Sequence, residues 1–405
     1  MFAFPTPRPH IRRQRGFSLI EVMIGAAIAL IGMVVIFQVL TVWEERKRTT
    51  SAGSDAQVAG AIAMYSLERD LRLAGFGFGM TNFMGCSITA FDTVRAAAIQ
   101  GTAAQPVFRL YPVEILKGAG GAADEIRVLY GNSEHFSANQ NFILSPDAFS
   151  KRTQGGNTGF QPGELAIVAG NSPANCDLVE ITGTANGGQD LVHAVGAYTN
   201  YLGQNVTARY NAAAGTGAIY TTGTMYNLGP AQQWQAPPPT VSFAQWNIWH
   251  IQPTAGSTVP RVLAWSDFLH VPPAGAVWTE VAEGIVNLQA QYGYDDDGNN
   301  MIECPNGAAL CEWVNTLVTP PLTAPIAWSK VRAVRVALLA RSQQYEKLAV
   351  TNAAPAWAGG AFAMTNVDGT ADTNPGDAND WRHYRYRVYQ QVVPLRNMIW
   401  GTSPS

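Results

Sequence analysis

The longest pattern in the chain is an apolar stretch that runs from position 17 to position 43. After Glu21 it contains no charged residue, and Gln38 and Thr41 are its only polar side chains beyond that point. As an α-helix it would span about 40 Å at about 1.5 Å per residue. The hydrocarbon core of a bilayer is about 30 Å thick, so the stretch is predicted to be a membrane-spanning helix.

Helical spacing continues beyond this stretch. Two series of apolar residues recur at steps of three and four: Val58, Ile62 and Tyr65, and Met64, Leu67 and Leu71. The glycine-rich segment 75–79 then ends the pattern, because glycine is common just past a helix C-terminus. We predict one helix over residues 17–73. Its amphipathic half is assigned to residues 44–76, a range that includes the short segment in which the helix ends. Gly53 and Gly60 are candidate bends.

After the glycines, apolar residues alternate with polar ones, which is typical of β-strands. The expected strands lie at 126–130, 164–169, 178–182, 286–294, 330–340 and 382–393. This order predicts an α+β protein: a long N-terminal helical spine packed on a β-rich, mainly antiparallel head over residues 77–405. Residues 182–250 are expected to form long loops or an inserted β subdomain, with Pro237–Pro239 as a stiff extended element.

A short basic segment precedes the apolar stretch, and one carboxylate stands near the start of that stretch. Four arginines, Arg8, Arg12, Arg13 and Arg15, are followed by the string Gly16-Phe17-Ser18-Leu19-Ile20-Glu21. A carboxylate at membrane depth is costly, so Glu21 is expected to have a function and a partner. The arginines outweigh the nearly balanced charges of residues 44–48, and the positive-inside rule therefore predicts a cytoplasmic N-terminus and an exported head.

This string resembles the class III leader of type IV pilins and pseudopilins. The resemblance implies that residues 1–16 are a leader, which a prepilin peptidase removes after Gly16 before it methylates Phe17. Glu21 would then be the fifth residue of the mature chain. In the family this glutamate pairs with the N-terminal amine of a neighbouring subunit, which fits the rule that a buried charge needs an opposite charge.

Further segments are similar to PilW-type minor pilins: residues 66–75, 283–295, 328–339 and 395–397. The resemblance implies a minor pilin that enters type IV pili by its N-terminal helix and helps prime assembly near the tip. Its implied partners are other minor pilins, the major pilin and a PilY-type tip adhesin. Its implied location is the inner membrane, with the head in the periplasm, and afterwards the extracellular pilus.

Four other interpretations of the N-terminus and head compete with this one. An ordinary secretory signal peptide would use Ala27–Ala29 as its cleavage site, but Glu21 argues against it. A plain unprocessed anchor also fits the hydropathy. The others are a J-type pseudopilin of type II secretion, whose head is typically much smaller, and a membrane-anchored binding or adhesive domain that does not polymerise, for which Glu21 has no use.

Composition fits an exported protein better than a cytosolic enzyme. Charged residues make up only 14%, while there are 39 glycines and 24 prolines, which is typical of turn-rich β proteins. Without the leader arginines the net charge is near −7, so the chain is not an obvious polyanion binder. The sequence has no Gly-x-Ser-x-Gly, His-Glu-x-x-His, P-loop or Cys-x-x-Cys motif, and its six histidines are scattered. We therefore expect no enzyme, no catalytic residue and no cofactor.

The four cysteines, Cys86, Cys176, Cys304 and Cys311, are candidates for disulfides, because an even number in an exported chain favours pairing. Three pairings are formally allowed. Cys304 and Cys311 are close enough in sequence to staple a short loop, which would leave Cys86 with Cys176. A metal site is less favoured, since no histidine lies at a suitable spacing.

Two short segments have a functional and a structural interpretation. Asp295, Asp297 and Asn299 around Gly298 could wrap Ca²⁺, but the glycine position departs from the EF-hand pattern and a polar hairpin turn explains the same residues better. The run from Trp381 to Arg387 interleaves arginines with aromatics, as single-stranded nucleic acid sites do. A strand with tyrosines inward and arginines in solvent is favoured, so nucleic acid is not an expected partner.

Overall fold

The structure is a computed structural model. It describes residues 16, 18–79, 83–103, 105–135, 139–157, 159–170, 175–216, 220–231, 243–253, 260–304, 311–316, 328, 330–364 and 380–399. The leader segment 1–15, Phe17 and Pro237–Pro239 lie outside the described residues. The chain divides into two compact units, Met1–Ser54 and Asp55–Ser405, and each is considered by itself.

Helix α1 (Leu19–Leu73) is continuous, as the apolar spacing predicted. Its first turn is capped by Ser18, and its last turn is followed by Gly75, whose φ of +79° is readily adopted only by glycine. The Gly75 N–H donates to the Leu129 carbonyl oxygen at 3.0 Å, so the chain leaves the helix directly onto a strand of the head.

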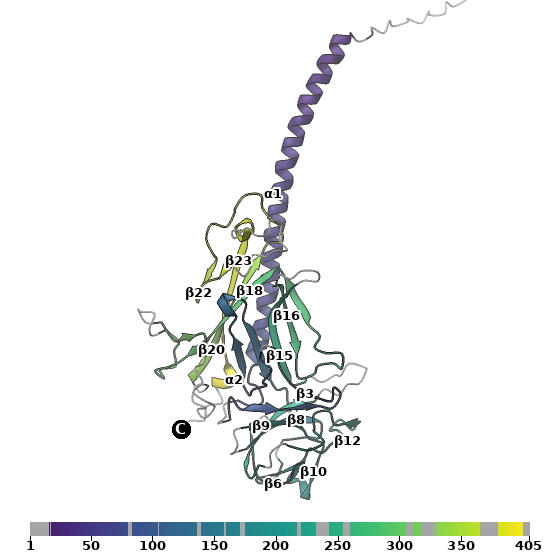
Figure 1. The fold of residues 1–405 in the computed structure, drawn as a ribbon, viewed down its shortest axis with the longest axis vertical. Coiled ribbons are helices and arrows are strands. Elements are labelled where there is room, and N and C mark those ends of the chain that lie inside the picture. Colours follow the sequence, from purple (N-terminus) through teal and green to yellow (C-terminus); the bar gives the residue numbers. More distant parts are fainter. Residues whose placement is uncertain are drawn as a thin grey trace, which may run out of the picture. The chain divides into compact units, whose positions relative to one another are not determined.

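Strands are the main regular secondary structure of the head, and turns and irregular segments connect them (Figure 1). They are β1 (Ser87–Thr89), β2 (Phe91–Asp92), β3 (Ala97–Ala98), β4 (Val113–Leu116), β5 (Glu125–Tyr130), β6 (Gln140–Asp147), β7 (Ser150–Thr153), β8 (Glu164–Gly170), β9 (Asn175–Glu180), β10 (Gly183–Ala185), β11 (Asp190–Val192), β12 (Ala197–Thr199), β13 (Asn205–Thr207), β14 (Gly223–Pro230), β15 (Gln245–Pro253), β16 (Pro260–Asp267), β17 (Thr279–Glu283), β18 (Ile285–Tyr294), β19 (Trp313–Val314), β20 (Val331–Arg341), β21 (Ala356–Trp357), β22 (Gly360–Ala361) and β23 (Tyr386–Pro394). Short helical turns occur at Ala119–Gly121, Asn186–Gly188 and Asp380–His383, and a short α2 at Arg396–Ile399.

Three larger sheets carry the head. Their strand orders are β17-β16-β15-β5-β4, β19-β18-β20-β23 and β1-β9-β8-β14-β6-β7-β11-β10. The paired strands are antiparallel except β1 with β9, which run parallel. The α+β class with a mainly antiparallel head is therefore confirmed. Residues 182–250 contain β10 to β14 and the first part of β15, and β10, β11 and β14 belong to the eight-stranded sheet.

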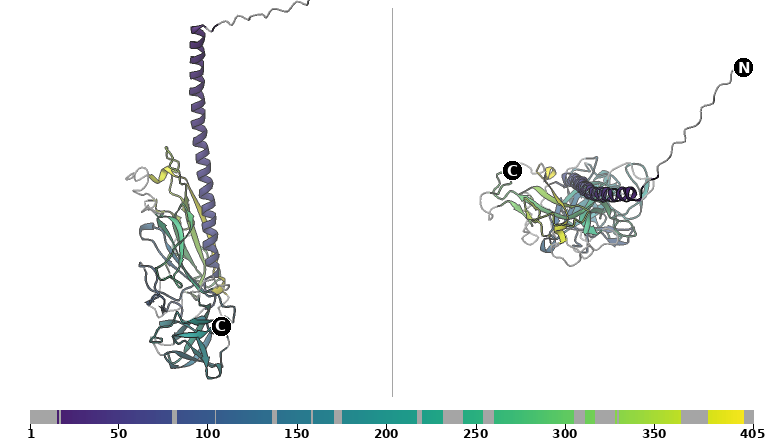
Figure 2. Two further views of the ribbon diagram at one scale, coloured as in Figure 1. Left: turned by 90° about the vertical axis from the view of Figure 1, so that its right-hand side faces the viewer. Right: turned by 90° about the horizontal axis from the view of Figure 1, so that it is seen from above.

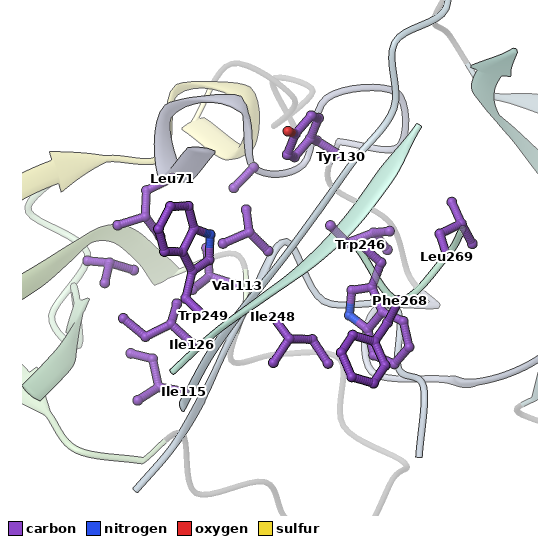
Figure 3. Packing of buried hydrophobic residues seen from close by; sticks show 14 of the residues in the cluster. Leu71, Val113, Ile115, Ile126, Tyr130, Trp246, Ile248, Trp249, Phe268 and Leu269 are labelled. Carbon is purple, nitrogen blue, oxygen red and sulfur yellow. The ribbon is translucent and has the colours of Figure 1, made fainter. Parts of the chain in front are cut away.

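In the unit Asp55–Ser405, the last turns of α1 lie along the five- and four-stranded sheets, and the eight-stranded sheet lies beyond the helix C-terminus (Figures 1 and 2). The main core joins the buried face of α1 to both smaller sheets. Figure 3 shows this junction, with Leu71 of α1 against Trp249 of β15 and Val113 of β4 nearby.

One predicted strand is partly wrong. Residues 382–393 were expected to be extended throughout, but Asp380–His383 forms a 3-10 turn and β23 begins only at Tyr386. Trp381 and Tyr384 are both buried, three residues apart. This spacing suits a helical turn rather than the two-residue period of a strand, and the tyrosine-arginine alternation concealed it.

Candidate functional site

Glu21 lies in the first turn of α1. Its N–H donates to Ser18 Oγ at 3.2 Å and to the Ser18 carbonyl oxygen at 3.1 Å. Ser18 thus acts as the helix cap, and the partial positive charge of the helix N-terminus favours an acidic side chain there. Gly16 and the Glu21 side chain are exposed. Phe17 lies outside the described residues, so cleavage, methylation and pairing of Glu21 stay predictions.

The apolar part of α1 is long enough to cross a membrane. Within the described residues, Leu19–Thr41 has a mean hydropathy of 2.6 over its best window, and none of that window is buried. Exposed fractions of its large apolar side chains run from 48% at Leu40 to 80% at Leu19. Such a surface is not stable in water. The helix therefore fits membrane anchoring and burial among other helices.

The rest of α1 uses only one of its two predicted apolar series to pack on the head. Met64, Leu67 and Leu71 are buried in the main core, as the spacing predicted. The other series is at the surface: Val58, Ile62 and Tyr65 are 56%, 48% and 70% exposed. Periodicity identified both faces, but it did not show which of them the sheets would cover.

A buried carboxylate ties the helix to the head. Asp70, only 4% exposed, accepts hydrogen bonds from Asn247 Nδ2 at 2.7 Å and Trp249 Nε1 at 2.9 Å, and a longer one from Tyr130 Oη at 3.4 Å. Burial raises the pKa of Asp70, although these hydrogen bonds and the charge of Arg69 act in the opposite direction. The three partners come from β15 and β5, so one side chain fixes how α1 lies on the five-stranded sheet.

The C-terminal segment holds the same helix from another side. Asn397 Nδ2 donates to the carbonyl oxygens of Leu73 and Ala74, at 3.2 and 3.1 Å, and so satisfies acceptors that a helix end leaves free. Tyr389 of β23 donates its hydroxyl to the Gln57 carbonyl oxygen at 2.8 Å. A Cβ at Gly60 would overlap the Tyr389 ring, so this glycine permits close approach.

Both disulfides expected from the sequence are present. Cys86 is bonded to Cys176, with Cα atoms 5.9 Å apart, and joins β9 to the segment before β1. Cys304 is bonded to Cys311 across seven positions. In the chain-entropy model, a crosslink that closes about 90 residues stabilises by about 4–5 kcal/mol and the short one by about half as much. The longer one therefore contributes more to holding the head.

The acidic segment after β18 is a hydrogen-bonded turn. Carboxylate oxygens of Asp295, Asp297 and Glu312 lie within 4.8 Å of one another, which is close enough to hold a cation. However, Asp295 already accepts from the backbone N–H groups of Gly298 and Asn300, at 2.8 and 3.0 Å, and from Arg332 Nε at 3.2 Å. Burial opposes ionisation of Asp295, but these bonds together hold its pKa below the usual value.

Asn299 is likewise used within the turn, since its side-chain amide donates to Asp297 and Glu303. The carboxylate of Glu312 accepts from the N–H groups of Asp296 and Glu303. These hydrogen bonds are the contacts expected within a polar hairpin turn, and they agree with the hairpin-turn interpretation of this segment.

The segment from Trp381 to Arg387 has its aromatic rings directed to the head. Trp381 and Tyr384 are buried, whereas Arg382, Arg385 and Arg387 are exposed. The guanidinium of Arg341 lies 4.0 Å from the centre of the Tyr384 ring, and Arg385 pairs with Glu346 at 3.1 Å. The rings of Trp381 and Tyr384 therefore pack within the protein and the arginines face solvent, as predicted, although the segment begins with a 3-10 turn rather than the expected strand.

Sequence reasoning missed a buried amine in the distal sheet. Lys151 on β7 is fully buried, and its Nζ lies 3.2 Å from His193 Nε2 and 3.4 Å from Thr216 Oγ1. Burial lowers the pKa of Lys151 to about 8 and that of His193 to about 3. A neutral His193 can accept a hydrogen bond from the ammonium. Neither residue lies in a recognisable motif, so no signal in the sequence would have singled them out.

Comparison with known families gives two matches. A model described as Type IV Pilus-assembly protein W matches residues 267–397, and one described as a prokaryotic N-terminal methylation motif matches residues 11–37. Comparison with curated proteins and with solved structures found no significant match. The first match spans β18, β20 and β23 and includes Tyr389 and Asn397, which contact α1. The strands that carry the Asp70 partners, β5 and β15, lie outside it.

The methylation motif covers the first part of an exposed apolar helix, and the second part of the same helix packs on a β-rich head. This arrangement is typical of pilin-like subunits of the type IV pilus. The match to the pilus-assembly protein W model specifies the class further. The two matches support a PilW-type minor pilin, and both point to a structural component rather than an enzyme.

Proposed function

We propose that this subunit enters type IV pili through α1 and helps prime pilus assembly near the tip. One observation carries the proposal: the residues that match the methylation motif include most of an apolar helical span, Leu19–Thr41, whose best window has no buried residue. A surface of that kind requires lipid before assembly and neighbouring helices afterwards. Other minor pilins, the major pilin and a PilY-type adhesin at the tip are the proposed partners.

Before assembly, the subunit would be stored in the inner membrane with its N-terminus in the cytoplasm and its head in the periplasm. A prepilin peptidase would cut between Gly16 and Phe17 and methylate Phe17. Intact-mass and N-terminal peptide analysis of the protein from its host should find a chain that starts at methylated Phe17. A chain that starts after Ala29, or that retains Met1, would contradict the proposal.

In this proposal Glu21 pairs with the Phe17 amine of a neighbouring subunit inside the filament. Removing one partner of a buried ion pair costs about 3–5 kcal/mol, whereas near the membrane interface water and headgroups can satisfy the same carboxylate. Glu21→Ala is therefore expected to be processed and stable in the membrane but unable to restore pili in a deletion strain. Glu21→Gln separates charge from hydrogen bonding, because it fails if charge is required.

Glu44→Ala is the matched control, since it removes an acidic residue from the same helix beyond the apolar span. It should restore normal pilus numbers. Normal piliation by Glu21→Ala would refute the proposed contact. Loss of protein secretion with intact pili would instead favour a J-type pseudopilin, and an effect on adhesion alone would favour an anchored binding domain.

A further inference from the structure

The series Val58, Ile62 and Tyr65 on α1 is not used by the core, and part of it borders a groove. A hollow of about 330 Å³ lies between this part of α1 and the turn from β17 to β18. Val58 and Ile62 of α1 and Val281 of β17 line it, together with the buried Ala56 and Ala282. All of these residues belong to the unit Asp55–Ser405.

The rim of the groove is acidic. Asp55 and Glu283 both line it, both are exposed, and neither forms an ion pair with another described residue. The basic residue in the wall, Arg341, is 3% exposed and stacks on Tyr384. Two carboxylates beside an apolar surface attract a cation, and the low dielectric of the apolar wall strengthens that attraction.

We propose that this groove docks the N-terminal helix of a different pilin-like subunit, one that carries a lysine or arginine followed one turn later by apolar residues. The inference rests on the proposed function, since it names a partner for the same helix. Subunits inserted in one membrane with the same topology present parallel helices. A parallel partner would place its basic residue near Asp55 and its apolar residues against Val58 and Ile62 by helix-to-helix packing.

The charges of the groove disfavour two other occupants. A bilayer surface is anionic and would repel Asp55 and Glu283. A second copy of this chain has the basic residues Arg46–Arg48, but Thr49, Thr50 and Ser51 follow them. It would bring polar side chains to the apolar part of the groove. The basic residues of this chain therefore match the acidic rim, but the polar residues that follow them do not match the apolar wall of the groove. The proposed partner is for this reason a different subunit.

Site-specific photocrosslinking of the full-length protein in its host tests this partner. A photoreactive phenylalanine analogue at Ile62 should crosslink to another pilin-like subunit, at a peptide where a basic residue precedes apolar ones. The same analogue at Val277, an exposed apolar position that does not line the groove, should give no such product. Crosslinks from Ile62 only to a second copy, only to lipid or to no protein would overturn the proposal.

Charge reversal tests the acidic rim. The double variant Asp55→Lys, Glu283→Lys should lower the Ile62 crosslink at least tenfold. Glu280→Lys makes a similar change on the same strand outside the groove and should leave the yield unchanged. An unchanged yield in the double variant would refute the role of the rim.

The crosslink is measured in membranes and in sheared pili, relative to the amount of this subunit in each. A subunit that reaches the pili but gives no Ile62 crosslink refutes the groove alone. A subunit that is absent from pili, in cells that assemble pili normally without it, refutes the proposed function. A crosslink to another pilin-like subunit in membranes would still support the groove in that case.

Discussion

The two halves of α1 are both rich in apolar residues, yet they differ in what covers them. Between Leu19 and Thr41 the large apolar side chains are about half exposed or more, whereas Ala63, Leu67 and Leu71 are completely buried. Hydropathy shows that a helix surface must be covered but not by what. The first half fits membrane anchoring and pilus incorporation, whereas one face of the second half is covered by the head of the same chain.

The difference lies in the polar and small residues between the apolar ones. The second half carries Asp70, which three side chains of the head contact, and Gly60, which allows Tyr389 to approach. Around Gly25 and Gly32 in the first half, nothing in the structure would meet an added Cβ. The second half thus has residues that match one particular surface of the head, whereas Gly25 and Gly32 in the first half have no such close neighbour.

The largest expected effect comes from emptying the covered face. Leu71→Ala leaves a cavity in the main core and should lower the free energy of unfolding by about 2–5 kcal/mol. Leu30→Ala makes the same change on the exposed half and should leave unfolding of the head unchanged. Urea unfolding of the full-length protein in detergent, followed by tryptophan fluorescence, measures both. Equal losses would show that the two halves do not differ as described.

A smaller effect is expected from adding one methyl group to each half. Gly60→Ala would force Cβ into the Tyr389 ring, and overpacking of this kind costs about 1–3 kcal/mol. Gly32→Ala meets nothing and should be neutral or slightly stabilising, because alanine is the better helix former by about 1 kcal/mol. The same unfolding measurement tests the pair. A neutral Gly60→Ala would mean that Tyr389 does not pack there.

Much of this organisation is predictable from sequence because it depends on local periodicity. The length of α1, its end before Gly75, and strands such as β18 and β20 follow from spacings of 3.6 and two residues. Both disulfides followed from export and sequence separation. The segments that resemble PilW-type minor pilins contain Leu67, Asp70 and Asn397, which are contacts between the helix and the head.

What could not be predicted depends on long-range pairing. The Asp70 network joins residues about 60 and 180 positions apart, and no local pattern distinguishes the buried Asp70 from its charged neighbours Glu68, Arg69 and Arg72. The same limit applies to the choice between the two apolar faces of α1, to the sheet that includes β10, β11 and β14, and to the buried Lys151. Gly60 was a candidate bend, whereas α1 is continuous through it and needs the glycine for contact with β23.

The smallest expected effect is a pH dependence from Asp70. Because burial raises its pKa above 3.8, the folded protein binds this proton more tightly than the unfolded chain does. The contribution of Asp70 to stability is therefore fully present below about pH 3.8 and is lost as the pH rises through its folded pKa. Asp70→Asn can keep the hydrogen bonds, with its oxygen accepting from Asn247 and Trp249 and its amide donating to Tyr130, and it should remove this dependence. The free energy of unfolding, measured with urea from pH 4 to pH 8, should therefore fall more steeply with rising pH in the wild-type protein than in Asp70→Asn, by less than about 1.4 kcal/mol per pH unit. Identical slopes for the wild-type protein and Asp70→Asn would show that Asp70 does not titrate as a buried residue of the helix junction.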